Sequence, residues 1–146
     1  MEERELQIKN QSELQERFVT ALENSKFEFE NYFFANFLNL KFTYEKESCI
    51  INCKIENFML NPRQKLHGGI TAFLMDASMG HLCRKYLGSC VTLEMKVQYF
   101  EAVTEGTVRC EAVFLKKGKT INYLESKIIN DHGLVLAMAT ATFKKI

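Results

Sequence analysis

One apolar segment, Ile70–Leu87, constrains the fold of this 146-residue chain more than any other. Two glycines precede it, and Gly88 follows at the position of a left-handed helix cap. Apolar residues occupy most sides of the expected helix, 69–87, and such a helix is expected to be buried. A single carboxylate, Asp76, stands within it. Because a buried carboxylate is costly unless it is paired, hydrogen-bonded or protonated, Asp76 is the first candidate for a functional residue.

Alternation of apolar and polar residues predicts strands on both sides of this helix. They are expected near residues 40–45 and 49–55 before the helix, and near 91–99, 108–114, 121–129 and 134–143 after it. Because the turns between the last four strands are short, these strands are expected to form an antiparallel meander. The inner face of the sheet needs a cover, and the apolar helix is the simplest one. The expected fold class is α+β, with a single antiparallel sheet of about six strands wrapped around a long central helix.

The residues before the sheet are expected to form N-terminal helices. Residues 1–28 predict a polar helical extension, and the aromatic segment 29–38 predicts a second, short helix. The aromatic side chains are expected to pack in the core, with the lining of a substrate tunnel as the alternative. No repeat or linker interrupts the chain, so residues 1–146 are expected to form a single domain.

Charge and composition exclude several classes of function. The net charge of +1 implies no general attraction to nucleic acid or to anionic membranes. The first residues are too polar for a signal peptide and no apolar run is long enough for a membrane span, which favours a cytoplasmic protein. The five cysteines form no CxxC pair and the three histidines are far apart, so we expect reduced thiols and no metal site.

The residues around the long helix resemble the signature of a known family. Asn61, the run His67-Gly68-Gly69, Asp76 and Gly80 match the N-x5-HGG-x6-D-x3-G pattern of hotdog-fold acyl-CoA thioesterases, in the PaaI-like (phenylacetate-degradation type) group of the 4-hydroxybenzoyl-CoA thioesterase superfamily. The resemblance covers residues 38–146. It departs at Gln64, where the family usually has glycine, and at Phe100, where proline often stands.

The resemblance implies a hotdog fold and hydrolysis of an acyl-CoA, aryl or fatty, to the free acid and CoA, with no cofactor. Glycines at a helix start let a ligand approach the backbone, and the first N–H groups there lack partners within the helix. The amides of Gly68 and Gly69 can therefore polarise the thioester carbonyl. Asp76 would then act as a general base on water or as a nucleophile.

The resemblance also implies supporting roles, each with a simpler alternative. Asn61 would position water or the carbonyl, or would only form a turn. His67 would fix the oxyanion loop or lie near the leaving thiolate, or would only cap the helix. Thr92 would contact water beside Asp76, or would simply be a strand residue. Asp76 itself could be a structural carboxylate that a backbone N–H or Thr92 satisfies. The basic hairpin would meet the phosphates of CoA, or would be a solvated turn; it comprises Lys116, Lys117, Gly118 and Lys119.

Spacing argues for a homodimer. Gly68 and Asp76 are eight residues apart, which is ~12 Å along one helix, so one carbonyl cannot touch both within a chain. If two helices pack antiparallel about a two-fold axis, Asp76 of one chain faces Gly68 of the other, and the active sites are shared. Pairing into a homotetramer stays open, as do the acyl group and a carrier-protein thioester. The alternative functions are a non-catalytic acyl-CoA binding or sensing protein and a hotdog hydratase or dehydratase.

Overall fold

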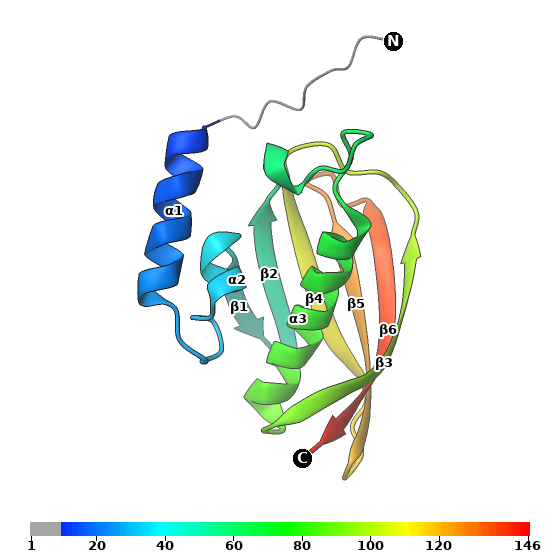
Figure 1. The fold of residues 1–146 in the computed structure, drawn as a ribbon. Helices are drawn as coiled ribbons and strands as arrows, with labels where there is room; N and C mark the ends of the chain where they lie inside the picture. The colour runs from blue at the N-terminus through cyan, green and yellow to red at the C-terminus, as the bar shows by residue number, and fades with distance from the viewer. Residues whose placement is uncertain (1–9) are drawn as a thin grey trace.

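The computed structural model describes residues 10–146 (Figure 1). Its elements follow the order expected from the sequence, with one added 3₁₀ turn, η1. They are α1 (Gln11–Asn24), α2 (Phe33–Phe37), β1 (Lys41–Glu45), β2 (Ser48–Lys54), η1 (Asn57–Met59), α3 (Gly68–Tyr86), β3 (Cys90–Tyr99), β4 (Thr107–Lys116), β5 (Ile121–Ile129) and β6 (Val135–Lys145). The six strands form one antiparallel sheet, and α3 lies across its face, as in the hotdog fold that the resemblance implies.

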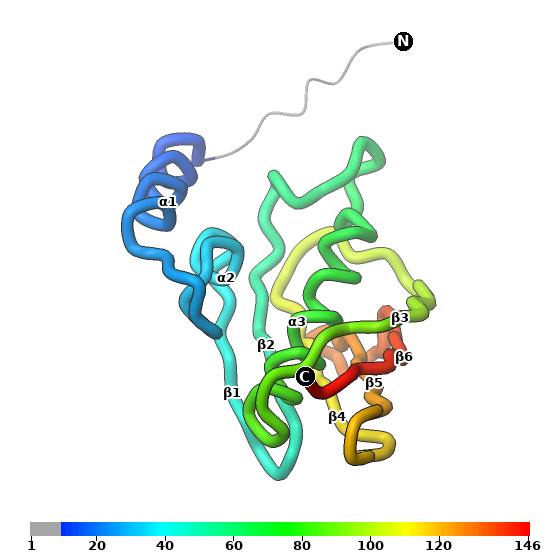
Figure 2. The backbone as a smooth tube through the Cα atoms, turned by 60° about the horizontal axis from the view of Figure 1, so that its bottom comes forward, coloured from blue at the N-terminus to red at the C-terminus, as the bar shows by residue number. Residues whose placement is uncertain are grey.

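The expected meander of the last four strands is wrong in one respect. The sheet order is β1-β2-β4-β5-β6-β3, so only β4, β5 and β6 form a meander. β3 pairs with β6, in a register that joins Met95 to Ala141 and Tyr99 to Ala137. The place beside β4 is taken by β2, and the connection after β3 crosses the end of the sheet instead of turning back as a hairpin (Figure 2). β3 is therefore an edge strand.

The helix α3 is held by its apolar contact with the sheet. Leu74, Met75 and Leu82 are fully buried against it, and the helix contacts β2 to β6. The cap after the helix is as expected, because Gly88 has φ +98° and its N–H donates to the carbonyl of Cys83 at 3.2 Å.

The expectation that α3 is buried holds for only one side of the helix in a single chain. The stripe that faces away from the sheet is only half-buried, because the sheet covers one side of the helix and nothing in residues 10–146 covers the other completely. It comprises Ile70, Phe73, Asp76 and Gly80. Asp76 is therefore a half-buried carboxylate, not a fully buried one.

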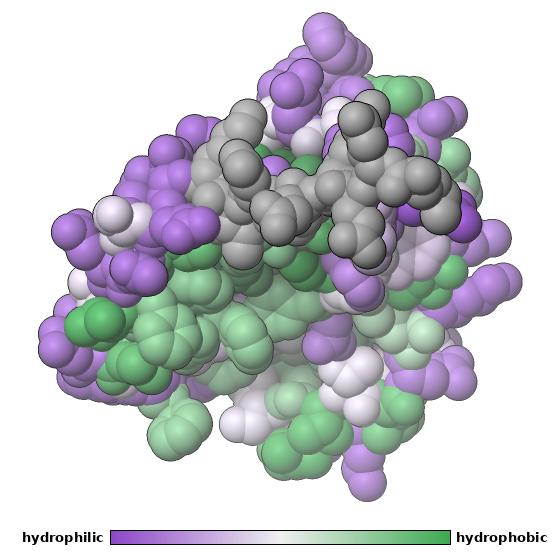
Figure 3. Space-filling view, turned by 45° about the horizontal axis from the view of Figure 1, so that its top comes forward, coloured by the Kyte–Doolittle hydropathy of each residue, from purple (hydrophilic) through white to green (hydrophobic). Residues whose placement is uncertain are grey.

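The N-terminal helices lie beside the β1 edge of the sheet (Figures 1 and 2). The second helix is shorter than expected, because residues 27–32 form a loop that leads into α2. The aromatic residues of this loop and of α2 do not all join the core: Phe27 is fully exposed, and Phe29 and Phe34 are about half exposed. Hydrophobic side chains gather in the middle of one face of the molecule, between hydrophilic margins (Figure 3).

Candidate functional site

Asp76 lies midway along α3 and is hydrogen-bonded to the edge strand. The hydroxyl of Thr92 donates to Asp76 Oδ1 at 2.8 Å. Thr92 is the third residue of β3, just before the point where the register between β3 and β6 shifts. The structure thus joins two residues that the sequence pattern singled out, and the second carboxylate oxygen accepts no hydrogen bond from residues 10–146.

The start of α3 is organised by His67. Its Nδ1 accepts a hydrogen bond from the Gly69 N–H at 3.0 Å, so the ring caps the helix. The Gly69 amide is therefore engaged within the chain. The Gly68 N–H, in contrast, has no acceptor among the described residues. Of the two glycine amides, that of Gly68 is the one available to a ligand, at the positive end of the helix dipole.

Tyr99 closes over Gly68, a contact that the sequence did not reveal. The Tyr99 hydroxyl donates to the Gly68 carbonyl at 2.7 Å. A Cβ at position 68 would lie only 3.3 Å from the tyrosine ring, so the absence of a side chain permits this approach.

Asn61 orders the loop before the helix. Its Oδ1 accepts from the N–H groups of Arg63 at 2.9 Å and Lys65 at 3.2 Å. These bonds form an Asx turn, which is the simpler of the two roles expected for Asn61. Gln64 in this loop has φ +59°, a conformation that glycine adopts more easily. The position where the family usually has glycine is thus left-handed in this chain.

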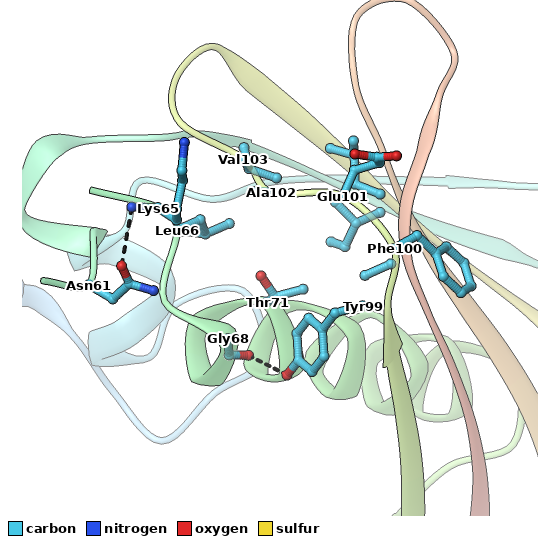
Figure 4. Close-up of a pocket in the computed structure, with 13 residues that line it drawn as sticks. Asn61, Lys65, Leu66, Gly68, Thr71, Tyr99, Phe100, Glu101, Ala102 and Val103 are labelled. Carbon is cyan, nitrogen blue, oxygen red and sulfur yellow. Dashed lines mark hydrogen bonds between the residues drawn. The ribbon is translucent and has the colours of Figure 1, made fainter. Parts of the chain in front are cut away.

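A cavity of about 330 Å³ opens between this loop, the start of α3 and the end of β3 (Figure 4). Gly68 and Tyr99 lie on one side of it, Asn61 and Lys65 on another, and Phe100 to Val103 line the rest of the mouth. Phe100, which stands where the family often has proline, is therefore part of this cavity.

A second cavity, of about 370 Å³, contains Asp76. Its floor is formed by Phe73, Ala77 and Gly80 of α3. Its wall is the loop before α2, with the rings of Phe27, Phe29 and Tyr32. The Asp76 carboxylate is thus flanked by β3 on one side and by an aromatic loop on the other.

The basic hairpin lies at the opposite end of α3 from Gly68. Lys116, Lys117 and Lys119 are exposed, and Lys117 Nζ pairs with Glu47 Oε1 at 2.5 Å. The turn is held by Asn122, whose buried Oδ1 accepts from the Gly118 N–H at 3.0 Å. The structure supports a well-formed hairpin with exposed cations, and it does not join the hairpin to Asn61 or Gly68 within one chain.

A buried histidine on α3 carries a hydrogen-bond network that sequence reasoning missed. His81 is 3% exposed and stacks on Phe42, with ring centroids 4.3 Å apart. Its Nδ1 lies 3.3 Å from the Tyr44 hydroxyl and its Nε2 lies 3.3 Å from the Tyr32 hydroxyl. The Tyr44 hydroxyl donates to Glu30 at 2.5 Å. Since Tyr44 has one proton to give, His81 Nδ1–H donates to Tyr44, and Nε2 accepts from Tyr32.

The environment keeps His81, Tyr32 and Tyr44 neutral at pH 7. Burial lowers the pKa of His81 to about 4, against a smaller opposing effect of Glu30. Burial, together with the nearby carboxylate of Asp76, raises the pKa of Tyr32 to about 12. Burial and the hydrogen bond to Glu30 also raise the pKa of Tyr44.

Stability is therefore expected to fall as the pH drops from about 6.5 to about 4. In this window the unfolded chain binds a proton at His81 and the folded chain does not, so the loss is on the order of 2–3 kcal/mol. Urea unfolding measures the free energy of unfolding at pH 7 and at pH 4.5. The decrease between the two pH values should be smaller in His81→Gln than in the wild type. His132→Gln, at an exposed turn, should keep the full drop. Equal drops in the wild type and His81→Gln would refute this assignment.

The cysteines are the other group of side chains in which reactivity could be expected. Burial raises the pKa of Cys49 and Cys53 to about 12 and that of Cys110 to about 11, so these thiols stay protonated at neutral pH. All five cysteines are free. Among residues 10–146, no cluster of three or more His, Cys, Asp or Glu side chains could hold a metal. No helix in the same range is long and apolar enough to cross a membrane.

Comparison with solved structures finds the same fold in several bacterial proteins. The BH2602 protein of Bacillus halodurans, solved with CoA, is 24% identical over 92% of this chain and 89% of its own, with a TM-score of 0.79. The PaaI protein of the E. coli phenylacetic acid degradation operon is 20% identical over 89% and 96%, with a TM-score of 0.77. Conserved protein PA5202 of Pseudomonas aeruginosa is 26% identical over 77% and 93%, with a TM-score of 0.72.

A search of curated proteins found no match to this sequence. The model of the thioesterase superfamily matches residues 64–137, which is just over half of the chain and includes the start of α3, Asp76, Thr92 and the basic hairpin. The fold, the PaaI-like sequence signature and this match agree. The chain belongs to the thioesterase superfamily.

Proposed function

We propose that this protein hydrolyses acyl-CoA thioesters to the free acid and CoA, with Asp76 as general base or nucleophile. The observation that carries the proposal is that α3 holds both a half-buried carboxylate and a first amide, that of Gly68, which has no acceptor within residues 10–146. Thr92 donates to one oxygen of Asp76, which fixes the carboxylate and leaves its other oxygen for a water molecule or for the carbonyl carbon.

The carbonyl oxygen would be held by the Gly68 N–H. Negative charge develops on that oxygen when the carbonyl carbon is attacked, and the helix dipole and the N–H both stabilise it there. His67 supports this role indirectly, because the hydrogen bond that it accepts from the Gly69 N–H fixes the first turn of α3. Asn61 orders the adjoining loop and lines the cavity at Gly68.

The two halves of the site would come from two chains. Asp76 and Gly68 are both on α3, eight residues apart, which is ~12 Å along the axis. We propose a homodimer in which the helices pack antiparallel, so that each Asp76 faces the partner's Gly68. Within the part of the chain that the structure describes, β3 is an edge strand with one side unpaired, and such an edge favours pairing with another chain. Val91 and Leu93 on that strand are 41% and 53% exposed.

CoA would be recognised by the cations of the basic hairpin. Lys116 and Lys119 are exposed, and Lys117 would exchange its surface pairing with Glu47 for a phosphate. The solved structure of the Bacillus halodurans protein contains CoA, which supports a CoA thioester as the substrate here.

The proposal is tested by hydrolysis of a panel of acyl-CoA esters, with the released thiol trapped by a chromogenic reagent. The panel would include benzoyl, phenylacetyl and short, medium and long fatty acyl groups. We expect thiol release above a blank that corrects for the protein's own cysteines. Tight binding of the esters with no turnover on any of them would instead support a non-catalytic acyl-CoA sensor.

A further inference from the structure

The loop before α2 separates two hollows on the surface of α3. Residues 27–32, here called the aromatic strap, contribute Phe27, Glu28 and Phe29 to both. One hollow is the 370 Å³ cavity that contains Asp76. The other, of about 590 Å³, lies toward the end of α3 and is lined by Tyr44, Arg84 and Lys85. His81 lies at the base of both.

The strap is fastened to the helix and the sheet at several points. Tyr32, at its end, is hydrogen-bonded to His81 at 3.3 Å. Glu30, in its middle, accepts from Tyr44 of β1 at 2.5 Å. The ring of Phe29 packs edge-on against His81, with centroids 4.9 Å apart, and Arg84 lies 5.7 Å above the same ring.

A backbone hydrogen bond also joins the residue before the strap to a residue near its end. The Lys26 N–H donates to the Asn31 carbonyl at 2.9 Å, and Glu30 takes a left-handed conformation with φ +70°. A non-glycine residue in that conformation is strained, and such strain persists only where the surroundings impose it. The side-chain anchors of Glu30 and Tyr32 supply that constraint.

The hollow on the Asp76 side has the character of an acyl site. Its walls are mostly aromatic and aliphatic, from the strap on one side and from Phe73, Ala77 and Gly80 on the other. Ligand sites combine such apolar walls with a few placed polar groups, and here Asp76 is the polar group on the helix. An acyl chain lying between the strap and α3 would bring its carbonyl end to the carboxylate.

We propose that the aromatic strap is the specificity wall of the acyl pocket, and that it sets the largest acyl group the enzyme accepts. Phe29 is the residue that touches the acyl group, and His81 and Tyr32 are positioning residues that hold the strap in place. This inference rests on the proposed thioesterase function. Since Phe29 separates the two hollows, loss of its ring would join them and lengthen the space available to a chain.

The test compares kcat/KM for hexanoyl-, dodecanoyl- and benzoyl-CoA in the wild type and in four variants. Phe29→Ala should raise the dodecanoyl-to-hexanoyl ratio about tenfold, because a hydrophobic pocket discriminates by roughly this factor for small changes in size. Tyr32→Phe removes only the hydroxyl that binds His81, and should raise the ratio less, through KM more than through kcat. Phe18→Ala is the matched control, since Phe18 is a 44% exposed ring on α1 outside both hollows.

The outcomes separate this inference from the function beneath it. If the wild type hydrolyses none of the esters, the proposed function fails. If the wild type is active but Phe29→Ala keeps the wild-type ratio, the strap inference alone is overturned. Phe29→Leu keeps an apolar side chain, so its dodecanoyl-to-hexanoyl ratio should lie between those of the wild type and Phe29→Ala. If Phe29→Ala and Phe18→Ala shifted this ratio equally, the change would be a general loss of packing. That result would also overturn the inference.

Discussion

Asp76→Asn is expected to lower the turnover of the best acyl-CoA substrate by about 10²–10⁴-fold, the range typical of a general base. The amide keeps the size of the side chain and can still accept the hydrogen bond from Thr92. It can neither take a proton from water nor attack the carbonyl. Because the side chain is only half-buried in the chain, the variant is expected to fold. The measurement is kcat with the preferred ester, alongside circular dichroism and the oligomeric state.

The matched control for this variant is Asp131→Asn. Asp131 is an exposed carboxylate in the turn between β5 and β6, and its loss removes the same charge from the molecule. It should leave turnover unchanged. Full activity in Asp76→Asn would refute the assigned chemistry, whatever the control does.

Gly68→Val is expected to lower kcat by about 10²–10³-fold, the effect of losing one donor to a developing oxyanion. A Cβ at this position already lies 3.3 Å from the Tyr99 ring, and the two methyl groups of valine would displace that ring and shield the amide. Gly68→Ala should show a smaller loss, since the tyrosine must shift by only a few tenths of an ångström.

Tyr99→Phe distinguishes the two causes of such a loss. It removes the hydrogen bond to the Gly68 carbonyl and keeps the ring, so it should reduce kcat only mildly. If Tyr99→Phe were as damaging as Gly68→Val, the tyrosine and not the glycine amide would be the important group. If Gly68→Val kept wild-type kcat, the amide of Gly68 would have no part in the reaction.

The parts of the fold that are local in sequence could be predicted. Alternation located all six strands, and the apolar segment with Gly88 located α3 and its cap. The place of β3 could not be predicted from its short connection to β4. Strand order depends on which neighbour completes the sheet, and β2, from before the helix, occupies the position beside β4.

The candidate site shows the same limit. The spacing of His67, Gly68 and Asp76 marks residues whose roles depend on a helix start and a helix face, both of which are local. Tyr99 and His81 could not be found this way. Tyr99 reads as one more residue of an alternating strand, and His81 acts with Tyr32 and Tyr44, which lie 49 and 37 residues away in the chain.

The central claim is that each site is built from Asp76 of one chain and Gly68 of its partner. Co-expression of Asp76→Asn with Gly68→Val tests it most directly, because each variant alone should be almost inactive. In a mixed dimer one site combines an intact Asp76 with an intact Gly68, and the other carries both changes. With random pairing, half of the dimers are mixed and each has one good site of two, so we predict about one quarter of wild-type activity. Co-expression of Asp76→Asn with Asp76→Ala is the control and should recover no activity. If Asp76→Asn with Gly68→Val also recovered no activity, that result would contradict the shared site.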